Sequence, residues 1–73
     1  MNAWIRIDRG IYRLFNIEAH PDKNQIIFRY LLEMDRYACG YAEIDSQRID
    51  ATMEYIVACI ETGKVIDLRP GSS

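Results

Sequence analysis

The chain has 73 residues, of which 49% are hydrophobic and 27% are charged, and its formal net charge is −2. This length predicts a single domain, and the small net charge excludes a protein drawn to nucleic acids or acidic membranes by its overall field. No apolar run approaches the about 20 residues of a membrane-spanning helix.

We expect one domain over residues 1–69 and a flexible tail over residues 70–73. No charged and then apolar signal segment opens the chain, which favours a reducing, cytoplasmic compartment. The two cysteines, Cys39 and Cys59, are therefore interpreted as buried small apolar residues rather than a disulfide. Together with the lone His20 they lack the paired spacing of zinc ligands, so no metal is predicted.

The first part of the chain is predicted to form strands. Residues 4–8 alternate between apolar and polar side chains. Arg9 and Gly10 are expected to form a tight turn, in which Gly10 can take positive φ, and residues 11–19 are rich in β-branched and aromatic side chains. That second strand is expected to place Ile11, Arg13, Phe15 and Ile17 on one face. Residues 21–24, Pro-Asp-Lys-Asn, are a strong turn signal.

Residues 25–35 are ambiguous between a strand and a helix. A strand places Ile26, Phe28, Tyr30, Leu32 and Met34 on one face, and the turn between two alternating runs favours it. The helical alternative over residues 22–35 leads to a winged-helix order and DNA binding. A turn at residues 35–36 then precedes a strand over 37–44, where Gly40 indicates a bulge or a close backbone approach.

One helix is predicted over residues 46–62. Asp45 or Ser46 can cap its N-terminus, and Gly63 suits the left-handed residue that closes a helix. Its core face has helical spacing and comprises Ile49, Met53, Ile56 and Ile60, with Val57 beside them. A short strand over residues 65–68 follows.

The predicted fold is α+β: an antiparallel meander of four to five strands with the long helix packed on one face. A helix is about 10 Å wide and strands lie about 4.8 Å apart, so one helix covers two or three strands. The remaining apolar surface predicts a protein partner, most simply a second copy in a homodimer. The alternative is a sheet coiled strongly enough to bury both faces by itself.

Arginines and aromatic residues interleave along the predicted strands, as in sheets that bind single-stranded nucleic acids. Acidic neighbours such as Asp8 and Glu18 weaken that match, and cross-strand ion pairs explain it equally. We expect a non-catalytic binding or regulatory protein without a cofactor, with nucleic-acid binding as the alternative and a small enzyme site at a dimer interface as a weaker third. The candidate binding residues are Trp4, Arg6, Arg13, Phe15 and Arg29.

Overall fold

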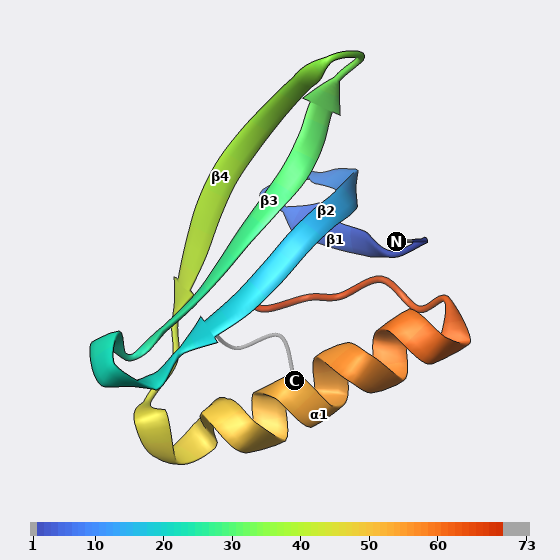
Figure 1. The fold of residues 1–73 in the computed structure, drawn as a ribbon. Helices are drawn as coiled ribbons and strands as arrows, with labels where there is room; N and C mark the ends of the chain where they lie inside the picture. Colours follow the sequence, from blue (N-terminus) through green and yellow to red (C-terminus); the bar gives the residue numbers. More distant parts are fainter. Residues whose placement is uncertain (1, 70–73) are drawn as a thin grey trace.

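The structure, a computed structural model, describes residues 2–69 and has an antiparallel sheet and one long helix (Figure 1). The sheet order is β1-β2-β3-β4, the same as the order along the chain. The predicted α+β meander is confirmed, whereas the tail predicted over residues 70–73 lies outside the described residues. The elements are β1 (Trp4–Ile7), β2 (Gly10–His20), a 3-10 turn η1 (Pro21–Lys23), β3 (Gln25–Glu33), β4 (Arg36–Glu43) and α1 (Ser46–Thr62).

The ambiguous third segment is a strand, because it pairs on both sides. β3 lies antiparallel to β2, with Leu14 opposite Tyr30, and to β4, with Phe28 opposite Gly40. Neighbouring strands joined by tight turns pair antiparallel, which the short connections of this chain allow. The winged-helix order, which needs a helix in this segment, is therefore not adopted.

The turns use Asx residues in the left-handed region. Asp8, Asn24 and Asp35 have φ of 52°, 53° and 68°, a conformation that Asn and Asp tolerate better than most residues. The prediction that Gly10 supplies the positive φ of the first turn is wrong, because Gly10 pairs with Ile7 in the ladder. Its missing side chain has another use: a Cβ there would lie 2.7 Å from the Tyr12 ring.

Helix α1 has the predicted bounds and caps. The Asp45 carboxylate accepts a hydrogen bond from the Gln47 N–H at 3.0 Å, and Gly63 closes the helix with φ of 75°. Its buried residues are Ile49, Ile56 and Cys59, with Met53 and Ile60 partly buried against the core. Val57, which was predicted beside this stripe, is instead 48% exposed, because the stripe is centred on the side of Cys59.

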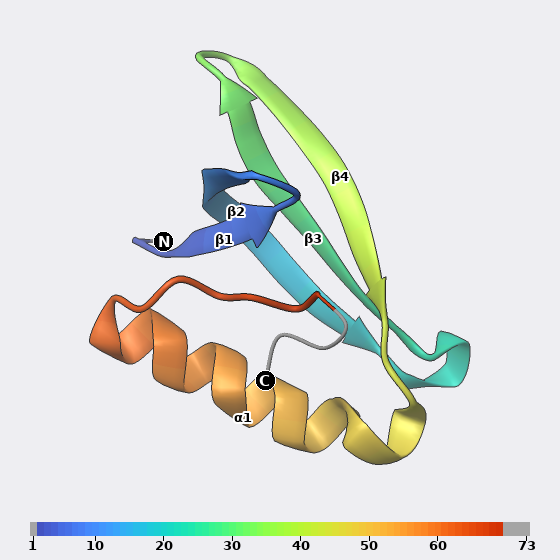
Figure 2. The same ribbon diagram turned by 180° about the vertical axis from the view of Figure 1, so that it is seen from behind.

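The strand predicted over residues 65–68 is reduced to one parallel bridge, between Ile66 and Ile5. The Ile66 N–H donates to the Trp4 carbonyl and the Arg6 N–H donates to the Ile66 carbonyl, both at 2.8 Å. Both views show this segment running between β1 and α1 (Figures 1 and 2). The sheet therefore has four strands, and one buried isoleucine of the C-terminal segment joins its β1 edge to the helix.

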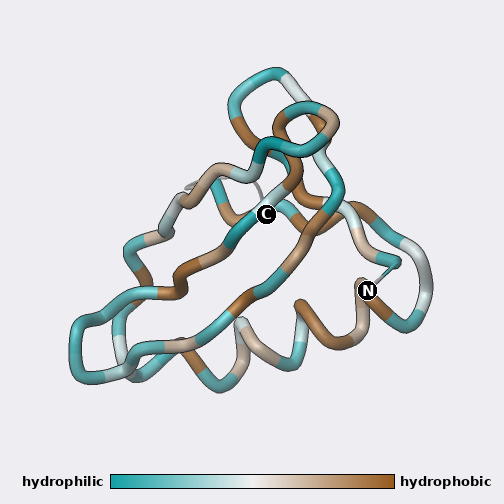
Figure 3. The backbone as a smooth tube through the Cα atoms, turned by 45° about the horizontal axis from the view of Figure 1, so that its top comes forward, coloured by the Kyte–Doolittle hydropathy of each residue, from teal (hydrophilic) through white to brown (hydrophobic). Residues whose placement is uncertain are grey.

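The core lies between α1 and one face of the sheet. Its fully buried side chains include Ile5, Leu14, Ile26, Ile56 and Ile66. Hydrophilic and hydrophobic residues alternate along the chain, as a core on one side of a sheet requires (Figure 3). Beyond the helix, aromatic rings of β3 cover small residues of β4. A Cβ on Gly40 would lie 2.6 Å from the Phe28 ring, so of the two predicted alternatives no bulge occurs at Gly40, and the close approach there is made by a side chain rather than by another backbone.

A β-bulge interrupts the pairing of β2 with β3 between Leu14 and Asn16. A bulge inserts one extra residue and so reverses the inward–outward alternation. Ile17 consequently lies opposite Phe28 and packs against the core. The prediction that Ile17 shares a face with Arg13 and Phe15 is wrong for this reason.

Truncation of two neighbouring helix residues tests the position of the core. Ile56→Ala should lower the free energy of unfolding by about 2–5 kcal/mol, because it leaves a cavity at a fully buried site. Val57→Ala should change it by less than about 0.5 kcal/mol, since Val57 faces solvent. Urea unfolding followed by circular dichroism measures both, and equal losses would contradict the placement of α1.

Candidate functional site

The face of the sheet opposite α1 carries an uncovered row of large side chains. We call this face of the sheet the open face. Directly opposed residues of an antiparallel pair share a face, and the register joins Trp4, Arg13, Leu31 and Tyr37 in one row across all four strands. Its large exposed side chains are Trp4 (39% exposed), Ile11 (48%), Phe15 (50%), Tyr37 (52%) and Tyr41 (60%).

The five candidate residues predicted from the sequence all lie on this face, although they come from three strands. Trp4 is opposite Arg13, and Arg29 is opposite the bulge of β2 at Asn16. The Phe15 side chain remains on the open face because the bulge follows it, as its ring contacts show. The residues predicted to be functional thus form one surface rather than separate sites.

Phe15, Arg29 and Tyr37 form a cluster at the centre of the open face. The rings of Phe15 and Tyr37 are 4.7 Å apart between centroids and tilted by 55°, an arrangement that aromatic pairs prefer. The Arg29 guanidinium carbon lies 5.2 Å from the centroid of the Phe15 ring, within range of a cation–π contact. The three side chains hold one another in place while at least half of each ring residue is exposed to solvent.

The arginines of the open face differ in their partners. Arg6 lies 3.7 Å from the Asp67 carboxylate, measured from Nε to Oδ2. Within residues 2–69, neither Arg13 nor Arg29 makes an ion pair. The positive charges of Arg13 and Arg29 are therefore available to a ligand. Cross-strand ion pairs, the alternative explanation of the interleaved arginines, do not account for these two residues.

Sequence reasoning missed two tyrosines and one isoleucine of this surface. Tyr37 and Tyr41 lie on β4 and Ile11 lies on β2, and all three are exposed. A signal for the tyrosines is present in the sequence: along β4, Tyr37, Cys39 and Tyr41 alternate with the smaller Ala38, Gly40 and Ala42. This period of two indicates one face pressed against other side chains and one left open.

The two cysteines have different surroundings. Cys59 is buried as predicted, but Cys39 is exposed, which corrects the prediction that both are core residues. Cys39 lies opposite Arg29 and so belongs to the open face. No group of three or more potential metal ligands occurs within residues 2–69.

His20 ends β2 at the rim of the open face. Its Nε2 lies 3.4 Å from Oε2 of Glu18, two residues earlier on the same strand. Both side chains are partly or largely exposed, so the pair has neither the enclosure nor the third orienting group that general base catalysis uses.

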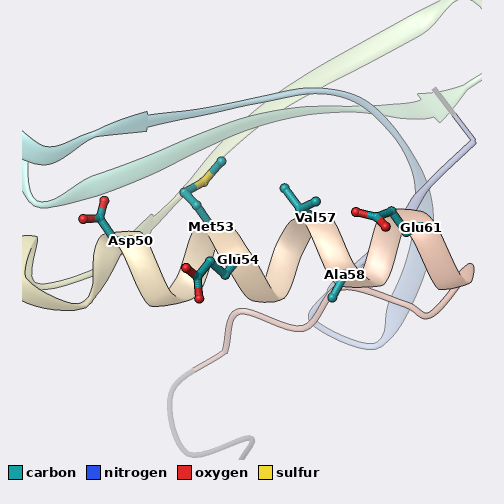
Figure 4. Close-up of a pocket in the computed structure, with 6 residues that line it drawn as sticks. All are labelled: Asp50, Met53, Glu54, Val57, Ala58 and Glu61. Carbon is teal, nitrogen blue, oxygen red and sulfur yellow. The ribbon is translucent and has the colours of Figure 1, made fainter.

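A shallow hollow of about 520 Å³ lies along the solvent side of α1 (Figure 4). Its lining residues are Asp50, Met53, Glu54, Val57, Ala58 and Glu61. The carboxylates are spread along the helix in Figure 4 and do not converge on one point. Convergent polar groups in an enclosed cleft characterise ligand pockets, and this hollow provides neither.

Asp67 is the charged centre of the C-terminal segment. Its carboxylate accepts hydrogen bonds from Arg69 Nε at 2.9 Å and Arg69 Nη2 at 2.8 Å. These bonds, helped by the charges of Arg69 and Arg6, hold the pKa of Asp67 at about 2, against an ordinary value of 3.8. The Asp67 N–H donates to Tyr55 Oη at 3.1 Å, and burial raises the pKa of Tyr55. Asp67 thus links α1, the C-terminal segment and the Arg6 side of the open face.

Comparisons of the chain with protein-family models, curated proteins and solved structures find no match. Within residues 2–69, no helix combines the length and the apolar character needed to cross a membrane.

The depressed pKa of Asp67 predicts a defined pH dependence. The folded state favours the ionised carboxylate, so its contribution to stability is present above pH 3.8 and is lost as the pH falls towards about 2. Asp67→Asn should therefore be less stable than the wild type near neutral pH, and this difference should shrink across that window. Urea unfolding at a series of pH values measures it. Asp50→Asn, on the exposed side of α1, is the control, and an equal pH-dependent difference there would contradict the assignment.

Proposed function

We propose that this protein is a non-catalytic binding module that engages a protein partner through its open face and assembles as a homodimer. The observation that carries the proposal is the exposed cluster of Phe15, Arg29 and Tyr37 at the centre of that face.

The composition of the open face supports a protein partner. Energetic centres of protein interfaces are enriched in Trp, Tyr and Arg, which combine large contact area with hydrogen bonding. Trp4, Arg13 and Tyr37 stand in one row of the register, next to Phe15. A sheet holds these side chains rigidly, so little conformational freedom is lost when a partner binds.

The open surroundings of the candidate catalytic groups support a non-catalytic role. The hollow on α1 is shallow and the potential acid–base pair of Glu18 and His20 is exposed. Catalytic acids and bases depend on environments that shift their pKa values and exclude water. The pKa of Asp67 is shifted as well, but the cause of that shift is its hydrogen bonding to Arg69, which is a structural contact.

The uncovered aromatic and aliphatic side chains support assembly. A domain of this length buries a small core, and oligomerisation is a common source of additional stability for such domains. Five large apolar or aromatic side chains remain exposed on the open face. Exposed large apolar side chains gathered on one face indicate an interaction site.

Bait variants test the open face. We expect Phe15→Ala and Tyr37→Ala to reduce capture of at least one protein by about tenfold or more, the loss typical of a residue at the energetic centre of an interface. Val57→Ala is the matched control, since Val57 on α1 is 48% exposed and Phe15 is 50% exposed. Quantitative affinity capture with folded baits measures the effect. Equal capture by all four baits, or a loss confined to Val57→Ala, would refute the use of this face.

A second candidate function is binding of single-stranded nucleic acid, favoured by Arg13 and Arg29, which make no ion pair within the described residues and lie on the same face as exposed rings. Aromatic stacking on bases with arginines on phosphates is a known mode of recognition on sheets. The net charge of −2 opposes it, which is why a protein partner is the leading proposal.

Salt dependence separates the two functions. Under the leading proposal, fluorescence anisotropy with labelled single-stranded DNA or RNA of about fifteen nucleotides should show no salt-dependent binding. Under the second, affinity should fall steeply with salt, and the double variant Arg13→Ala and Arg29→Ala should lower the logarithmic slope by about one to two. The second result would replace the leading proposal.

A further inference from the structure

The outer edge of β4 is the open edge of the sheet. β4 is last in the strand order, and residues 2–69 provide no segment that pairs with its outer side. The opposite edge, at β1, is partly closed by the bridge to Ile66. In Figures 1 and 2 the edge of β4 faces away from α1 and from the C-terminal segment.

The ladder fixes which backbone groups of β4 point outward. The Ile44 N–H donates inward to the Asn24 carbonyl at 2.9 Å, and inward and outward groups alternate along an antiparallel strand. Ala38, Gly40 and Ala42 therefore bond to β3. The N–H and C=O groups of Tyr37, Cys39, Tyr41 and Glu43 point away from it.

The edge of β4 lacks the features that keep edge strands apart. Lysines, prolines, bulges and inward charges normally protect an exposed edge from pairing. Between Arg36 and Glu43, residues 37–42 contain no charge and no proline, and the register shows no irregularity over residues 37–43. A regular row of unpaired donors and acceptors matches an extended strand rather than a helix or a small molecule.

The sequence of this edge is symmetric about Cys39. Tyr37 and Tyr41 stand two residues to either side of it, and the small residues Ala38 and Gly40 flank it directly. An antiparallel copy of the same strand would therefore meet tyrosine with tyrosine and small residue with small residue. This self-complementarity favours a second copy of the chain as the occupant.

We propose that β4 pairs antiparallel with β4 of a second copy about a two-fold axis through Cys39. Such an axis is perpendicular to the sheet, so both open faces lie on the same side and each residue meets one of the same face. Tyr37 then lies opposite Tyr41 of the partner subunit, and the outward backbone groups of Tyr37, Cys39 and Tyr41 are all satisfied. Centring the axis on Gly40 would place Glu43 opposite the partner's Tyr37 and leave the tyrosine pairs unformed.

This inference rests on the proposed homodimer and assigns its contact. It leaves Phe15, Arg29 and Trp4 free, and it joins the two open faces into one continuous surface. The dimer contact and the partner-binding surface share Tyr37, so Phe15 is the residue that tests the binding surface without touching the dimer contact.

Oxidative cross-linking tests the axis with a native thiol. Opposed residues in a hydrogen-bonded antiparallel pair have Cα atoms about 5.5 Å apart, a distance that a disulfide spans. We expect mild oxidation to link wild-type chains through Cys39 at least about tenfold faster than the double variant Cys39→Ser and Arg29→Cys. That control moves the thiol one strand inward on the same face, because Arg29 lies opposite Cys39. Equal rates would overturn the axis at Cys39.

The proline variant Tyr41→Pro tests the edge itself. It removes an outward N–H and no bond to β3, so the fold should persist by circular dichroism. Light scattering across a dilution series should give a dimer mass for the wild type and for Phe15→Ala, and a monomer mass for Tyr41→Pro. A wild-type monomer at every concentration, or a dimer mass for Tyr41→Pro, would overturn the edge contact. A dimer lost only in Phe15→Ala would place the contact on the open face, so the homodimer would stand while the edge fails.

Discussion

The structure depends on the limited width of its one long helix. Helix α1 and the segment around Ile66 cover the part of the sheet that contains Ile5, Leu14 and Ile26. No second α-helix occurs within residues 2–69 to cover the other face. On the helix side, the chain compensates with rings from β3 that lie over small residues of β4, as Phe28 does over Gly40. On the other side no described segment covers the sheet, and the aromatic side chains are exposed to solvent.

The sequence allowed most of this fold to be predicted because its signals are local. The cap at Asp45, the left-handed Gly63 and the helical spacing between them set the bounds of α1. The β2 bulge was not predictable in the same way, because it arises from the pairing of β2 with β3 and not from β2 alone. Val57 was wrongly predicted to lie beside the core face, because its burial depends on how α1 is rotated about its axis against the sheet.

The same distinction applies to the candidate binding face. Trp4, Arg13 and Phe15 were selected because arginines and aromatic residues interleave along the strands, and the antiparallel register of the structure then places them on a common face. The sequence could not show which arginines make ion pairs, because Arg6 pairs with Asp67, a residue about sixty positions later in the chain. The contribution of β4 was overlooked because its exposed side depends on the rings of β3 that fill its other side.

The contact between Phe28 and Gly40 also constrains how this chain can diverge. No larger side chain can enter position 40 while the aromatic ring at position 28 stays where it is, since the two would overlap. Homologous chains with a bulkier residue at position 40 should therefore carry a smaller residue at position 28. Such covariation between adjacent strands would record the β3–β4 register in an alignment even where every other residue had drifted.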